Sequence, residues 1–166
     1  TNINSALSDS GGCYTYYAAA SNALYLVNDN GVGSTGPMTV GTAGTLQNSQ
    51  CSIDVGASSV SKVGTELTLN LATTFKAAFA GGKNVYMWVH DTGTLDSGWQ
   101  NRGSWTVPTP PPLAVSVTPS SGSGSTQTFS FLFSDASGYA AINSTQTNIN
   151  SALSDFPIVG DQIRTN

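Results

Sequence analysis

Residues 66–72 read Glu-Leu-Thr-Leu-Asn-Leu-Ala, so apolar and polar side chains alternate through the stretch. An alternation of period two places the three leucines on one face of an extended strand. Residues 127–134, Gln-Thr-Phe-Ser-Phe-Leu-Phe-Ser, repeat the pattern with three phenylalanines. Strands that bury only one face are typical of antiparallel sheets. The two stretches therefore predict a protein in which the apolar faces of β-sheets pack together.

Shorter strand-like runs continue this pattern along the chain. They are separated by turns rich in Gly, Asn and Ser, of which Asn-Asp-Asn-Gly at 28–31 is the strongest signal. The runs are residues 13–17, 23–27, 52–55, 58–63, 84–90 and 113–118. About ten short strands at this spacing predict an all-β antiparallel sandwich. The only helix candidate is residues 73–80, which would form two turns at most or a loop.

Composition excludes several classes of partner. Only 8% of the 166 residues are charged, the net charge is −4, and five residues are basic. Without a basic patch, nucleic acid is a poor partner, and no apolar run approaches the ~20 residues of a membrane span. We therefore expect no nucleic acid binding and no membrane insertion. The sequence starts without methionine or a signal peptide, so we expect a mature or excised fragment.

The chain has two cysteines, Cys13 and Cys51, and both lie beside strand-like runs. The composition, rich in Thr, Ser, Asn and Gly and poor in Lys and Glu, indicates a secreted protein, in which a cysteine pair tends to oxidise. We therefore expect a Cys13–Cys51 disulfide, the alternative being two separate buried thiols. Two cysteines and the single His90 cannot by themselves form a conventional four-ligand metal site, so we expect no metal and no cofactor.

A proline-rich run, Pro-Thr-Pro-Pro-Pro at 108–112, is the one clear linker. Such a run is semi-rigid and extended. It divides the chain into a body, residues 1–107, and a strand-bearing arm, residues 113–155, followed by a tail, residues 156–166. The arm is too short to bury a sheet of its own, so its phenylalanines require an apolar surface from elsewhere.

The ends of the chain repeat each other. Residues 1–9, Thr-Asn-Ile-Asn-Ser-Ala-Leu-Ser-Asp, return letter for letter as residues 147–155, an offset of 147 − 1 = 146. An identity of this length indicates an array whose unit is about one domain long. After the second copy the pattern breaks, because the tail starts Phe-Pro-Ile-Val where the first copy is followed by Ser-Gly-Gly-Cys. The tail could dock as an edge strand or be a terminal remnant.

Several phrases resemble a known family. These are residues 97–108, with Trp-Thr-Val-Pro at their end, residues 117–129, with Val-Thr-Pro-Ser-Ser-Gly-Ser-Gly-Ser, and residues 48–53 and 74–87. They are similar to an immunoglobulin-like repeat of large secreted or surface proteins of soil bacteria. The resemblance implies an immunoglobulin-like antiparallel β-sandwich, a Cys13–Cys51 bridge and no enzymatic chemistry. It also implies circular permutation, because the family module opens after the proline-rich linker and closes at the Trp-Thr-Val-Pro strand.

Permutation would leave the body short of its opening strands, with an exposed apolar groove and an unpaired sheet edge. The strands of the arm would act as donor strands and replace the missing ones. Ile149 belongs to the repeated segment on the same arm. Two solutions stay open: the arm closes over its own body in cis, or it completes a neighbouring copy in trans, as in donor-strand complementation. The stiff linker favours the second. The residues expected to carry this contact are Val115, Val117, Phe129, Phe131, Phe133 and Ile149.

No constellation in the sequence points to catalysis. His90 and Asp91 are adjacent and so face opposite sides of a strand, and no Gly-x-Ser-x-Gly motif is present. Residues 91–96 resemble a calcium loop only faintly and are better read as a turn. Aromatic residues could stack on a sugar, although most such side chains pack in cores. The candidates are Tyr14, Tyr16, Tyr17, Trp99 and Trp105, with Tyr14 and Tyr16 on one face.

We therefore expect a non-enzymatic structural module, secreted or on a bacterial cell surface. It would assemble with neighbouring copies of itself into a fibre or stalk, through tandem repeats or donor-strand exchange. The alternative is a carbohydrate-binding adhesin module, with a glycan as the partner.

Overall fold

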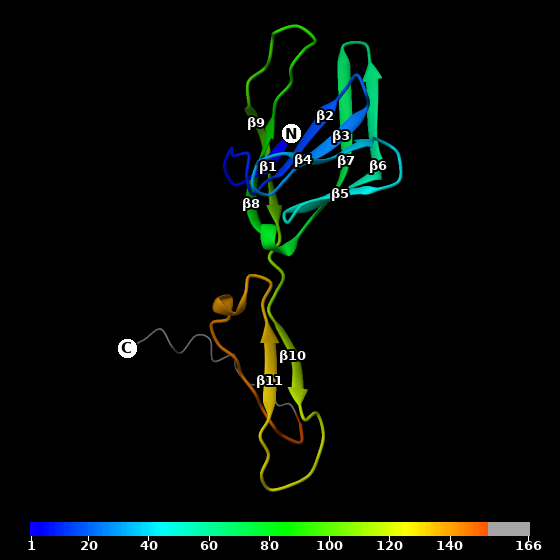
Figure 1. The fold of residues 1–166 in the computed structure, drawn as a ribbon. Helices are drawn as coiled ribbons and strands as arrows, with labels where there is room; N and C mark the ends of the chain where they lie inside the picture. The colour runs from blue at the N-terminus through cyan, green and yellow to red at the C-terminus, as the bar shows by residue number, and fades with distance from the viewer. Residues whose placement is uncertain (153–166) are drawn as a thin grey trace, which may run out of the picture.

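The computed structural model describes residues 1–152 and consists almost entirely of β-strands (Figure 1). Two short 3₁₀ turns, η1 (Ala77–Phe79) and η2 (Tyr139–Ala141), are the only helical elements in this part of the chain. The strands are β1 (Asn2–Asn4), β2 (Cys13–Ala18), β3 (Ala23–Val27), β4 (Ser34–Thr39), β5 (Thr45–Gln47), β6 (Cys51–Val63), β7 (Glu66–Phe75), β8 (Gly81–Met87), β9 (Gln100–Val107), β10 (Leu113–Thr118) and β11 (Ser130–Ser134).

The body contains two sheets of unequal size. The larger has six strands in the order β4-β3-β2-β1-β8-β9, and the smaller has three in the order β5-β6-β7. Every pair of neighbours is antiparallel. The predicted all-β antiparallel sandwich is therefore confirmed.

Local sequence explains the tightest turn of the smaller sheet. Val63 pairs with Glu66, so β6 and β7 are joined by two residues, and the first of them, Gly64, has φ +58°. A two-residue hairpin with glycine first is favoured because its twist matches that of the strands. The predicted strands 52–55 and 58–63 form the single strand β6, whose register with β7 shifts at a bulge between Asp54 and Ser59.

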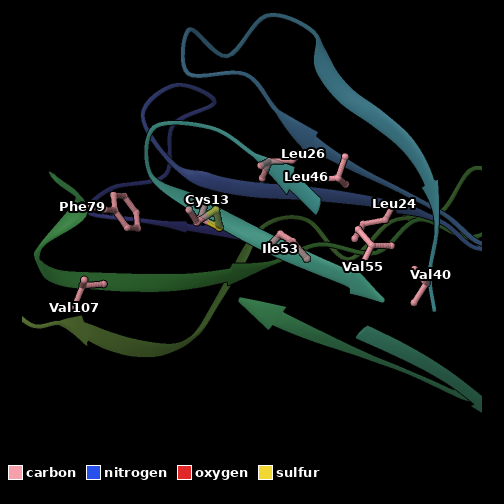
Figure 2. Close-up of a cluster of buried hydrophobic side chains, with 10 residues drawn as sticks. Cys13, Leu24, Leu26, Val40, Leu46, Ile53, Val55, Phe79 and Val107 are labelled. Atoms are coloured by element: carbon pink, nitrogen blue, oxygen red, sulfur yellow. A yellow bond between two sulfur atoms is a disulfide. The ribbon is translucent and has the colours of Figure 1, made fainter. Parts of the chain in front are cut away.

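The core lies between the two sheets, and all of its residues come from the body. Figure 2 shows side chains from both sheets facing each other around Cys13. The buried members are Cys13, Leu24, Leu26, Val40, Leu46, Cys51, Ile53, Val55, Phe79 and Val107. Cys13 and Cys51 form a disulfide, as predicted, and this bond joins β2 of the larger sheet to β6 of the smaller. The body thus has a core of its own, to which residues 113–152 contribute no buried side chain.

The smaller sheet covers only part of the larger one. Strand β5 contacts β3 and β4, and the disulfide places β6 against β2. The smaller sheet ends with β7, and from the order of the contacts we infer that positions beyond β7 would face β8 and β9. Within residues 1–152, no strand occupies those positions in the smaller sheet.

The arm forms a separate antiparallel hairpin of β10 and β11 (Figure 1). It projects away from the body beyond the proline-rich linker and does not close over its own body core. No residue of 113–152 is buried. A lone two-stranded hairpin is marginally stable in water, so the arm is the part of the chain that most needs a partner surface.

Three sequence predictions require correction. Residues 73–80 form no α-helix, because Thr73–Phe75 complete β7 and only η1 follows. The strand predicted over 127–134 begins at Ser130, and the strand predicted over 84–90 ends at Met87. For the two strands, the predicted run extends past the last pairing with its neighbour, which involves Thr118 of β10 and Gln100 of β9.

Candidate assembly interface

The first copy of the repeated segment forms strand β1 inside the larger sheet. Strand β1 lies between β2 and β8, with Ile3 opposite both Cys13 and Val85. Ile3 packs against the core, whereas Asn2 and Asn4 point to the other face of the sheet and are nonetheless buried. We call the space between β2 and β8 the β1 slot.

Hydrogen bonds explain the burial of the two asparagines. The side-chain amide of Asn2 donates to the carbonyl oxygen of Ser8 at 2.7 Å, and that of Asn4 donates to Ser10 at 3.0 Å. Residues 5–10 therefore fold back over β1. Gly12 closes the site, since a Cβ there would lie 2.9 Å from both Asn2 Oδ1 and Asn4 Nδ2. These bonds satisfy most of the polar groups that β1 removes from water.

Strand β8 holds the same segment from the other side. Lys83 Nζ donates to Ser5 Oγ at 3.2 Å, and the side-chain amide of Asn84 donates to the carbonyl oxygen of Ser5 at 3.2 Å. Lys83 is buried and its ammonium lies 4.4 Å from the ring centre of Phe79. The β1 slot thus recognises both the side chains of residues 2–4 and the backbone of residue 5.

The amino group of Thr1, next to β1, is also buried. It donates to the carbonyl oxygen of Thr15 at 2.9 Å, and burial lowers its pKa from 8.0 to about 6. Burial favours the neutral amine because the charged form loses its hydration.

This pKa predicts a pH-dependent stability for a chain whose first residue is Thr1. Between pH 6 and 8 the unfolded chain binds more protons than the folded chain, so the free energy of unfolding should rise with pH. Two pKa units correspond to roughly 2–3 kcal/mol. Urea unfolding at pH 6 and pH 8 measures the difference, and the same protein acetylated at Thr1 should lose it. Equal pH dependence in the two forms would show that the amine is not buried.

The second copy of the segment is not seated in a sheet. Ile149 is 75% exposed, and Asn148–Asn150 lie along a groove of about 670 Å³ that also contacts Val117, Phe129 and Phe131. Residues 153–155, the end of the repeat, lie outside the described residues, as does the tail predicted at 156–166.

The residues predicted to form the donor surface gather on the arm and leave apolar area exposed. Val115, Phe129 and Phe131 are exposed, while Val117 and Phe133 are half-buried. Val117 pairs with Phe131 across the hairpin, and the rings of Phe129 and Phe131 stack at 6.1 Å.

The body carries an exposed apolar surface whose residues were not predicted from the sequence. By strand alternation from Val85 and Val107, the side chains of Met87 and Trp105 lie on the core face of β8 and β9. They are 48% and 57% exposed, so the smaller sheet does not cover them. Leu67, on the unpaired edge strand β7, is 47% exposed. We call the exposed core face of β8 and β9, which carries Met87 and Trp105, the uncovered face, and treat the free edge of β7 as a separate open part of the body.

The other face of the larger sheet carries an aromatic cluster. The rings of Tyr14 and Trp99 meet edge to face at 5.5 Å, Trp88 lies 6.4 Å from Trp99, and His90 stacks on Trp88 at 5.6 Å. Of the sugar-stacking residues expected from the sequence, Tyr14 and Trp99 come together. Tyr16 contacts Tyr25 instead, Tyr17 packs against the core, and Trp105 lies on the uncovered face.

The acidic loop after β8 closes on itself. Asp91 Oδ1 accepts hydrogen bonds from the backbone amides of Gly93 and Leu95, at 2.8 and 3.1 Å. This is the geometry of a turn. Residues 1–152 contain no group of three or more His, Cys, Asp or Glu side chains that could hold a metal ion, and none of their helices is long and apolar enough to cross a membrane.

Comparison with known proteins found no match, whether with family models, curated proteins or solved structures.

Proposed function

We propose that this protein is a non-enzymatic, extracellular structural module that assembles into a fibre or stalk. The arm of one copy adds its hairpin to the smaller sheet of the next copy, beside β7. An immunoglobulin-like sandwich would then be complete, with the opening strands supplied by a neighbour. The disulfide and the secreted type of composition support an extracellular location.

The mismatch between the two sheets of the body carries the proposal. Six strands face three, β7 has no outer partner among residues 1–152, and Met87 and Trp105 on the core face of β8 and β9 are exposed. The arm provides two strands with an apolar surface and nothing of its own to pack on. An exposed edge strand is a template for strand addition, and the added strands would cover Met87 and Trp105.

The contact is heterologous, because the arm and the uncovered face are different surfaces. A heterologous contact that does not close into a ring grows a linear assembly. The linker supports this outcome, since five residues of extended polyproline span about 15 Å and carry the arm away from its own body.

Electron microscopy of the purified chain tests the proposal. Fibres or strings of particles are expected from the full chain, and single particles from residues 1–112, which retain all ten buried core residues. Single particles from the full chain at high concentration would overturn the proposal.

The aromatic cluster around Trp99 favours a second candidate, a carbohydrate-binding module. Aromatic rings beside amide side chains are a surface on which sugar rings stack, and Asn101 Nδ2 donates to Asn84 Oδ1 on the neighbouring strands. Because Trp99 contacts both Tyr14 and Trp88, Trp99→Ala should remove binding to any glycan identified on an array. Tyr139→Ala, which removes a fully separate exposed ring on the arm, should leave it unchanged. No glycan signal from the unaltered protein would eliminate this candidate.

A further inference from the structure

We propose that the copies are linked by strand exchange: residues 147–150 of one copy occupy the β1 slot of a second copy, in place of that copy's residues 1–4. This inference rests on the proposed assembly and specifies how the arm is held.

The sequence identity duplicates every side chain that the slot contacts. Asn148, Ile149 and Asn150 correspond to Asn2, Ile3 and Asn4. In the slot, Ile149 would pack between Cys13 and Val85 as Ile3 does, and Asn150 would lie opposite Asn84. The same segment shifted by one residue would turn the isoleucine away from the core.

The second copy shares one local hydrogen bond with the first. The amide of Ser5 donates to Asn4 Oδ1 at 2.8 Å, and the amide of Ser151 donates to Asn150 Oδ1 at 2.7 Å. Ile149 is exposed in the arm, so its burial in the slot would remove apolar area from water, to the half-buried level that Ile3 has there.

The position of the arm brings the segment to the slot. The larger sheet has the order β2-β1-β8-β9, so the slot is bounded by β8, one of the two strands of the uncovered face. An arm that covers β8 and β9 of a second copy would therefore bring residues 147–150 close to the β1 slot of that copy.

Cross-linking between two variants of the full chain tests the exchange. Asn84→Cys and Asn150→Cys proteins are mixed at equal concentration and oxidised, and the joined peptides are identified by mass spectrometry. A bond between positions 84 and 150 can then form only between two chains. The yield of this bond should be about a hundredfold higher than the yield obtained when Ser123→Cys, in the exposed arm loop, replaces Asn150→Cys. A residue bound in the slot has a high effective concentration next to position 84.

A locked variant supplies the second readout. In Asn4→Cys/Asn84→Cys the two cysteines face each other across β1 and β8, so oxidation should fix the resident strand and prevent the mixed bond and assembly together. Reduction should open the lock and restore assembly. If assemblies form normally with the lock closed, or if positions 84 and 150 cross-link no more than the control pair, the exchange is wrong while the proposed assembly stands. If no assemblies form in any protein, the proposed function itself fails.

Discussion

Phe131→Asp is expected to abolish self-association, raising the dissociation constant between copies by at least about a hundredfold. Burying a phenylalanine at an interface stabilises it by several kcal/mol, and a carboxylate in its place would be desolvated without a partner. Phe131 is 40% exposed in the arm, so the hairpin of the single chain should tolerate the change far better than the assembly does. Sedimentation velocity over a concentration series measures the effect.

The matched control is Tyr139→Asp. Tyr139 is 89% exposed on the same arm but lies in η2, outside the hairpin. It introduces the same charge without touching the proposed contact, so association should persist. Equal loss in both variants would indicate a general effect of charge, and no loss in Phe131→Asp would remove the hairpin face from the interface.

Replacing both Cys13 and Cys51 by alanine is expected to lower the free energy of unfolding by about 3–4 kcal/mol. The disulfide closes a separation of 38 residues and is the only covalent bond between side chains of the two sheets in residues 1–152. Both cysteines are buried in the middle of the core, so the variant also loses packing. Urea unfolding should show a midpoint lowered by about 1–2 M.

Reductant provides the internal control for the disulfide. It should shift the unfolding midpoint of the unaltered protein toward that of the double variant and leave the double variant itself unchanged. A midpoint that is the same with and without the bond would mean that the smaller sheet is held on the larger one by apolar packing alone.

The strand content of the fold was predictable where alternation is continuous and turns are explicit. The runs 23–27 and 113–118 coincide with β3 and β10 at both ends. Strand β1 was not predicted, because Asn-Ile-Asn has one apolar residue and its stability comes from β2 and β8 on either side. Strand β4 was also missed, because Gly36 and Pro37 interrupt it, which an edge strand tolerates.

The candidate site was predictable only in its parts. The alternation identified the arm's phenylalanines, and the repeat identified Ile149. The uncovered face is determined by the order of the strands in the two sheets. No local pattern in the sequence shows that Trp105 is left exposed on the core face of β9. Tyr14 and Trp99 of the aromatic cluster were predicted, whereas Trp88 and His90 were not. These two reach Trp99 through a loop whose path is set by tertiary contacts.

Hydrogen exchange of the full chain at low and high concentration tests the central claim that the arm of one copy completes the body of another. The account predicts that the amides of residues 67–71 in β7 and the β10–β11 hairpin become protected together as concentration rises, while β3 stays as it was. Protection of β7 that does not change with concentration, in a sample that nonetheless self-associates, would contradict it.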